Sequence, residues 1–163
     1  MENKKRKGFT LIELLIVIGI IAILAAIVYV AVDPARRLAE ARDATRWSEV
    51  NSVLNAVLKY TVDNRGTLPT NLAGATDDLY YVLGTAASGC NTGCTARTTQ
   101  GVCLDLTADL VDEYLSEIPQ DPSLADATPP YANTDYYIMK SANGRITVGA
   151  CDPERAAAIS VTR

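Results

Sequence analysis

The chain has 163 residues, a formal net charge of −4 and no histidine. An acidic protein is a poor match for nucleic acid, because the phosphate backbone attracts basic surfaces. The lack of histidine removes the commonest metal ligand and the usual general base of enzymes. We therefore expect neither a nucleic-acid-binding protein nor a histidine-dependent enzyme.

The amino-terminal end joins a basic cluster to a long apolar run. Residues 4–7 are all Lys or Arg, Gly8 follows, and residues 9–32 are apolar with one charged member, Glu13. As a helix these 24 residues span about 36 Å, enough to cross a hydrocarbon core of about 30 Å. Basic residues that precede such a run stay in the cytoplasm. We expect a single pass through the cytoplasmic membrane, with residues 1–8 inside and residues 33–163 outside.

The run is too long for an ordinary secretory signal, and no small-residue cleavage site follows it. A simple signal anchor is the alternative interpretation, and Glu13 bears on the choice. A carboxylate at the centre of a membrane helix costs about 2.5–3.5 kcal/mol and less near the interface, where Glu13 lies. It is an odd residue for a plain anchor, unless its side chain reaches the interface.

The segment KKRKGFTLIE and the apolar run together resemble the type III signal of type IV prepilins and pseudopilins. The resemblance implies that a prepilin peptidase, which is also an N-methyltransferase, cuts between Gly8 and Phe9. Residues 1–8 are then the leader, and the new amino group on Phe9 is methylated. The resemblance also implies that Glu13 neutralises the amino terminus of a neighbouring subunit, since charges in a low-dielectric bundle are tolerable only in pairs.

The helical pattern continues beyond the membrane run, over residues 33–64. Its apolar positions recur at helical spacing, and they are Trp47, Val50, Val53, Leu54, Val57 and Leu58. We assign much of the remaining surface to charged residues, among them Arg42, Asp43 and Arg46. Pro34 is a candidate kink, and Gly66 and Pro69 end the helix. One helix over residues 9–64 is about 80 Å long, and it is similar to the spine of the pilin fold.

The rest of the chain predicts a small antiparallel sheet behind a variable loop. We interpret residues 65–106 as that loop, with a short helix or strand near residues 76–85. Residues 107–117 are predicted to form a short helix. The sheet covers residues 135–163: a hairpin of residues 136–140 and 145–150 turns at Asn143-Gly144, and residues 158–162 add a strand. Of each tyrosine pair, at 80–81 and 136–137, we expect one ring inside and one half-exposed. The class is therefore α+β and pilin-like, with a long helix packed on a small sheet.

All four cysteines, Cys90, Cys94, Cys103 and Cys151, lie in the domain expected outside the membrane. An even number there predicts disulfides in an oxidising compartment. The pairing that spacing makes attractive is Cys90–Cys94 with Cys103–Cys151, although four cysteines allow three pairings. A zinc site is the rival, but zinc usually takes two short C-x2-C knuckles, which Cys103 and Cys151 do not form.

Residues 118–122, Ile-Pro-Gln-Asp-Pro, resemble a segment of the major pseudopilins of type II secretion systems. Those proteins often carry a calcium-binding loop after it, and here Asp121, Asp126 and Asp135 are the available oxygen ligands. Their spacing matches no calcium signature, so turn-capping aspartates are the alternative. We expect no cofactor.

The sequence predicts a structural subunit of a type IV pilus-like filament and not an enzyme. Its partners are identical subunits, the processing peptidase, the assembly platform with its ATPase, and the membrane before assembly. The filament lies at the cell surface or in the periplasm. Residues 118–122 favour a second interpretation, the major pseudopilin of a type II secretion system, whereas the cysteine-rich loop and the tyrosines favour a pilus. An uncleaved, membrane-anchored binding domain is the third.

Overall fold

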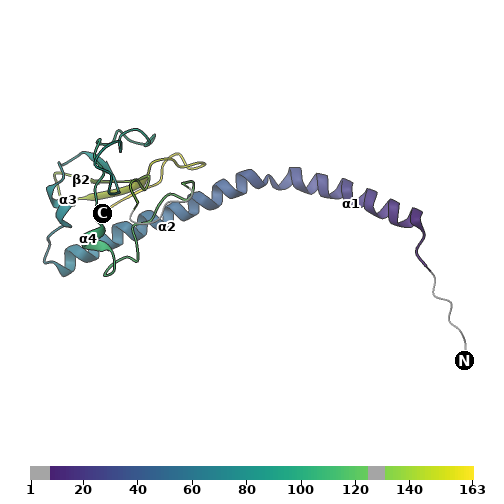
Figure 1. Ribbon diagram of the computed structural model, residues 1–163, viewed down its shortest axis with the longest axis horizontal. Helices are drawn as coiled ribbons and strands as arrows, with labels where there is room; N and C mark the ends of the chain where they lie inside the picture. The colour runs from purple at the N-terminus through teal and green to yellow at the C-terminus, as the bar shows by residue number, and fades with distance from the viewer. Residues whose placement is uncertain (1–7, 125–130) are drawn as a thin grey trace, which may run out of the picture. The chain divides into compact units, whose positions relative to one another are not determined.

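The structure is a computed structural model that describes residues 8–124 and 131–163. Most of the predicted leader, residues 1–7, lies outside the described residues. The chain divides into two compact units, Met1–Leu38 (unit 1) and Ala39–Arg163 (unit 2). A long amino-terminal helical region and a small antiparallel sheet confirm the predicted α+β class (Figure 1).

Unit 1 is built on helix α1 (Leu11–Val32), in which no residue is buried. The helix predicted over residues 9–64 starts later than expected, and it is interrupted beside Pro34, the candidate kink. It begins at Leu11, and it breaks at Asp33, whose left-handed φ of 43° ends α1. Helix α2 (Pro34–Asp63) starts at the next residue, because proline has no N–H to donate and fits the first helical position. The Asp33 side chain accepts a hydrogen bond from the Arg36 N–H and so caps this second start.

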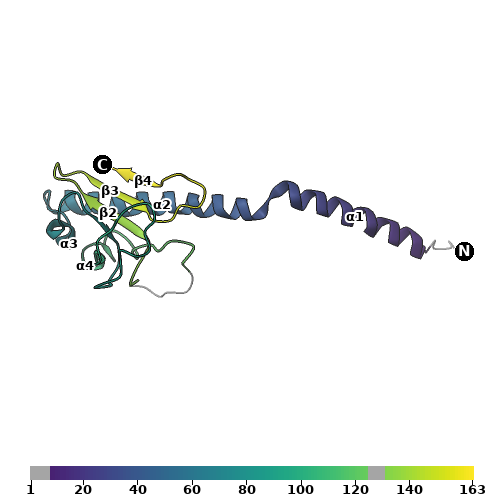
Figure 2. The same ribbon diagram turned by 90° about the horizontal axis from the view of Figure 1, so that it is seen from above.

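Unit 2 packs the remainder of α2 against a four-stranded sheet of order β1-β2-β3-β4, with every neighbouring pair antiparallel. The strands are β1 (Tyr80–Val82), β2 (Tyr136–Lys140), β3 (Ile146–Ala150) and β4 (Ser160–Thr162). Figure 2 shows β2, β3 and β4 side by side along α2. Gly144 adopts a φ of 77° in the β2–β3 turn, as a tight hairpin requires.

The segment 65–106 contains helix α3 (Thr70–Gly74), which was not predicted, and strand β1, which lies within residues 76–85, where a short helix or strand was predicted. Strand β1 adds an edge to the sheet expected over residues 135–163. Helix α4 (Thr107–Leu110) is much shorter than residues 107–117. It stops because Val111 is extended and Asp112 turns into the left-handed region, with a φ of 75°.

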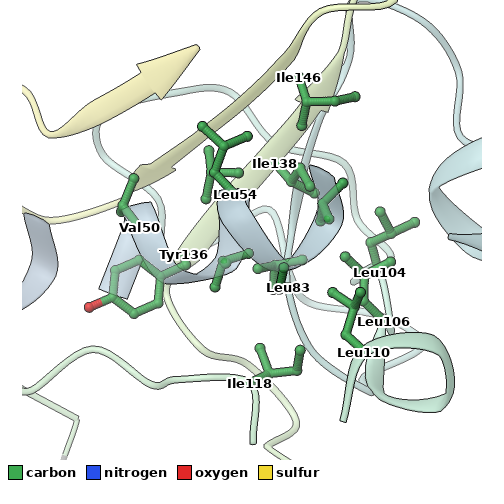
Figure 3. Close-up of a cluster of buried hydrophobic side chains, with 14 of the residues drawn as sticks. Val50, Leu54, Leu83, Leu104, Leu106, Leu110, Ile118, Tyr136, Ile138 and Ile146 are labelled. Atoms are coloured by element: carbon green, nitrogen blue, oxygen red, sulfur yellow. The ribbon is translucent and has the colours of Figure 1, made fainter. Parts of the chain in front are cut away.

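The sheet is covered on both faces, because successive side chains of a strand point to opposite sides. One face packs on α2 in the main core, a cluster that includes Tyr136 and Ile138 of β2 and Val50 and Leu54 of α2 (Figure 3). The other face carries a second cluster, in which Tyr137 packs with Val82 and three cysteines. The expectation that one ring of the 136–137 pair stays half-exposed is therefore wrong, since both are buried.

Candidate processing and assembly site

Gly8 and Phe9, the residues of the expected cleavage point, precede the helix and are exposed. The Phe9 residue is 82% exposed. Thr10, which follows, has an extended backbone with a ψ of 152°. The bond between Gly8 and Phe9 therefore lies outside the helical hydrogen bonding of α1.

Glu13, the residue expected to act in assembly, is held by Thr10 at the start of α1. Its Oε2 accepts hydrogen bonds from the Thr10 N–H at 2.9 Å and the Thr10 hydroxyl at 2.7 Å. The Glu13 N–H in turn donates to the Thr10 hydroxyl oxygen at 3.3 Å. This reciprocal pair is a capping box. Thr10 was not among the expected functional residues, although the spacing T-x-x-E before an apolar run is the signature of a capping box.

Beyond Glu13, helix α1 presents apolar side chains on every side. An 18-residue window in the helical stretch Leu11–Asp63 has a mean hydropathy of 3.2, with none of it buried. By length and composition, this is the one helix of the described residues that is able to cross a membrane. An apolar surface of this extent marks contact with lipid or with other proteins.

A family model described as the prokaryotic N-terminal methylation motif matches residues 3–29. The chain carries the signature of type IV pilins and pseudopilins. This pilin signature covers the basic cluster, Gly8, Phe9, the capping box and most of α1. It indicates a structural subunit rather than an enzyme, and it fits a membrane-anchored pilin precursor. No curated protein and no solved structure matches the chain.

Unit 2, which follows the pilin signature, is organised around a buried arginine that the sequence analysis assigned to the surface. Arg46 on α2 is 0% exposed. Its Nε and Nη2 donate to the two carboxylate oxygens of Asp121 at 2.6 and 2.8 Å, and its Nη1 donates to Asp43 at 2.7 Å. Glu154 accepts from the same guanidinium at 3.1 Å. A single side chain thus joins α2 to segment 118–122 and to the loop after β3.

Asp43 is the second centre of this cluster. Its carboxylate accepts the backbone N–H groups of Glu154, Arg155 and Ala156 at 2.7–2.9 Å. Burial by itself raises the pKa of Asp43, but these three hydrogen bonds and the one from Arg46 outweigh it and bring the pKa to about 2. Asp43 therefore stays ionised and fixes the loop after β3. A readable signal existed, since Ala39, Asp43, Arg46 and Val50 follow the helical spacing of one face.

Two of the three candidate calcium ligands, Asp121 and Asp135, lie within the described residues, and they do not form a metal site there. Asp121 is committed to Arg46 and to Ser123, which donates from its N–H at 2.8 Å and its hydroxyl at 2.6 Å. Asp126 lies outside the described residues. Asp135 is half-buried, and burial, followed by the nearby charge of Asp152, raises its pKa to about 6. Within residues 8–124 and 131–163, no group of three or more acidic or cysteine residues is arranged to hold a metal.

The cysteines form two disulfides, Cys90–Cys103 and Cys94–Cys151. The pairing that spacing favoured, Cys90–Cys94 with Cys103–Cys151, is therefore wrong. Backbone geometry gives the reason, because residues 99–104 run beside β1 through parallel bridges from Tyr80 to Thr99 and from Leu83 to Leu104. The Cys90 N–H donates to the Gly101 carbonyl at 3.1 Å, which places Cys90 next to Cys103. With both pairs bonded, no thiolate is left for zinc.

Proposed function

We propose that this protein is a structural subunit of a type IV pilus-like filament. The observation that carries the proposal is the methylation motif at residues 3–29 on a helix that buries none of its own apolar side chains. Such a helix needs a covering that its own chain does not supply. The membrane covers it before assembly, and the helices of identical subunits cover it afterwards.

Processing precedes assembly in this proposal. The prepilin peptidase cuts between Gly8 and Phe9, removes residues 1–8 on the cytoplasmic side, and methylates the freed amino group of Phe9. The exposure of both residues and the extended backbone at Thr10 support access by the peptidase. The membrane assembly platform and its ATPase then extract the helix, and repeated heterologous contacts between copies build an open filament at the cell surface or in the periplasm.

Glu13 sets charge balance and register between subunits. Its carboxylate pairs with the amino group of Phe9 on a neighbouring copy, because an unpaired charge in an apolar bundle is costly. In the single chain, the capping box with Thr10 holds the same carboxylate at the start of α1. The carboxylate is thus satisfied before assembly and already lies at the end of the helix where a neighbouring amino terminus arrives.

A second candidate is the major pseudopilin of a type II secretion system, which the resemblance of residues 118–122 favours. The two candidates share leader cleavage, methylation and polymerisation, and they differ in the machine that uses the filament. Deleting the gene in the native host separates them: loss of surface filaments supports a pilus, and retention of secreted enzymes inside the cell supports the secretion system.

The first experiment is mass spectrometry of the intact protein and its amino terminus, purified from the native host. We expect a chain that starts at N-methylated Phe9. A chain that still starts at Met1, in a host with an active prepilin peptidase, contradicts the proposal and favours an uncleaved, membrane-anchored binding domain.

The second experiment replaces Glu13 with alanine. We expect Glu13→Ala to leave a folded, membrane-inserted protein that forms few filaments, at least tenfold fewer by electron microscopy of sheared cells. Glu113→Ala is the matched control, because it removes an exposed carboxylate from unit 2. Normal filaments from Glu13→Ala, or an equal loss in the control, contradict the role of Glu13.

A further inference from the structure

The two disulfides of unit 2 interleave along the chain. Cys90 pairs with Cys103 across 13 positions, and Cys94 pairs with Cys151 across 57. The first cysteine in the sequence is therefore bonded to the third, and the second to the fourth, so neither disulfide joins consecutive cysteines. A disulfide-forming enzyme that acts on cysteines in their order of appearance makes a different pattern.

Proximity in the unfolded chain favours that different pattern. Cys90 and Cys94 are four positions apart. Because loop closure becomes less probable as the loop lengthens, Cys90–Cys94 is favoured over both native pairs, and most strongly over Cys94–Cys151. Export adds to this bias, because an amino-terminal anchor delivers Cys90 and Cys94 first and Cys151 last. This step rests on the export of unit 2 in the proposed function.

The folded domain does not allow later correction. Cys90, Cys103 and Cys151 are all buried, in the cluster that Tyr137 and Val82 complete. An enzyme reaches these sulfurs only while the second cluster is open. A Cys90–Cys94 bond occupies one sulfur of each native disulfide, so the cluster cannot close around the native pairs.

We propose that maturation of this protein requires a protein disulfide isomerase, a partner with a reactive thiolate in the compartment that receives unit 2. A disulfide-bearing oxidase first takes two electrons and two protons for each bond and leaves Cys90–Cys94 and Cys103–Cys151. The isomerase then rearranges these bonds with no net oxidation or reduction.

Thiolate attack accounts for the whole rearrangement. The isomerase thiolate attacks Cys90, breaks Cys90–Cys94 and releases Cys94 as a thiolate, so that Cys90 and the isomerase form a mixed disulfide. The Cys94 thiolate attacks Cys151, breaks Cys103–Cys151 and releases the Cys103 thiolate. That thiolate attacks Cys90 in the mixed disulfide, forms Cys90–Cys103 and returns the isomerase thiolate unchanged.

The test maps the disulfides of the full chain, expressed in a bacterial host with its periplasmic isomerase and in the same host without it. Free thiols are alkylated at harvest, and membranes are digested without reduction for mass spectrometry. We expect native linkages with the isomerase. Without it, we expect the peptide with an internal Cys90–Cys94 bond to become the main species and the Cys94–Cys151 linkage to fall at least fivefold. Equal native linkage in both hosts overturns the proposal.

Two variants that allow one pairing each are the controls. Cys94→Ser/Cys151→Ser leaves only Cys90 and Cys103, and Cys90→Ser/Cys103→Ser leaves only Cys94 and Cys151. We expect each remaining bond to form equally in both hosts. If these bonds also need the isomerase, it acts by a route other than exchange, and the proposal is wrong.

The readout separates this proposal from the filament function. The linkages are measured in membrane-bound chains, whether or not these chains polymerise, so a failure to form filaments leaves the result intact. Alkylation of all four cysteines in both hosts shows that unit 2 was not exported to an oxidising compartment. That outcome overturns the isomerase proposal together with the export on which it rests.

Discussion

Unit 1 and unit 2 depart in opposite ways from the usual distribution of side chains in a soluble protein. Unit 1 exposes apolar side chains, and unit 2 buries charged ones. In α1, residues such as Leu15 and Ile16 are more than half exposed, and no residue is buried. In unit 2, Arg46 and Asp121 are shut away from solvent, together with Asp43. The surface of α1 is therefore apolar, and the interior of unit 2 contains charged side chains.

The difference shows which region is complete as a single chain. The buried charges of Arg46, Asp43 and Asp121 pair with one another within unit 2, and no buried side-chain nitrogen or oxygen among the described residues lacks a hydrogen-bond partner. The apolar side chains of α1 have no covering within their own unit. Once its two disulfides have formed, unit 2 therefore supplies all of its own packing, and α1 needs lipid or other copies.

The largest expected effect comes from removing the buried charge of Arg46, which tests whether buried charge stabilises unit 2. Arg46→Met keeps much of the side-chain volume but leaves the carboxylate of Asp121 buried without its cation. Breaking such a pair costs about 3–5 kcal/mol, so we expect the free energy of unfolding of unit 2 to fall by that amount. Urea unfolding of the full chain in detergent, followed by the fluorescence of Trp47, the single tryptophan, measures it.

The matched control is Arg42→Met, which removes an arginine one turn away. Arg42 bonds Glu154 at 2.5 Å through both Nε and Nη2, but its side chain is 36% exposed, so solvent supports the ions when the pair is lost. We expect a much smaller change. In Arg46→Met/Asp121→Asn the most deeply buried of the uncompensated carboxylates is gone, and part of the stability should return. Equal losses in the two single variants contradict the central role of Arg46.

The next prediction compares one leucine in each unit. Leu54→Ala opens a cavity between α2 and the sheet, and such changes cost about 2–5 kcal/mol in a core. Leu15→Ala shortens a side chain that contacts no core of its own, so we expect the same urea transition as the unchanged protein. We expect Leu15→Ala to act instead on filament yield. A shifted urea transition in Leu15→Ala contradicts the independence of the two units.

Features of the fold that depend on neighbouring residues were predictable from the sequence. The apolar run predicted α1, and alternation around Asn143-Gly144 predicted the β2–β3 hairpin, because a tight turn and its strands are encoded within a few positions. The capping box of Thr10 and Glu13 is equally local and was available to the same reasoning.

Features that depend on distant partners were not predictable. Arg46 bonds Asp121 and Glu154, 75 and 108 positions away, and without these distant carboxylates the burial of its guanidinium is costly. Residue type assigned it to the surface, whereas helical spacing placed it on the core face, and tertiary structure decided between the two. The disulfide pairing failed for the same reason, because it follows from residues 99–104 lying beside β1.

The smallest expected effect concerns Asp135, the charged group that unit 2 does not neutralise well. Burial, and then the charges of Asp152 and Asp121, raise its pKa to about 6 from an ordinary 3.8. Between these values the folded protein holds a proton that the unfolded chain has released. Stability therefore falls as the pH rises from about 4 to about 6, and the full penalty is present at pH 7.

Asp135→Asn removes this penalty, since asparagine does not ionise and tolerates the left-handed φ of 57° at this position. Because the side chain is only half-buried, solvent screens part of the effect. We expect the melting temperature at pH 7 to rise by about 2–4 °C and the dependence between pH 4 and 6 to flatten, both followed by circular dichroism. Asp112→Asn is the control, because Asp112 is also left-handed, with a φ of 75°, but exposed. If Asp112→Asn raises the melting temperature as much as Asp135→Asn does, the backbone conformation is the cause. The buried charge of Asp135 then carries no penalty in the folded protein.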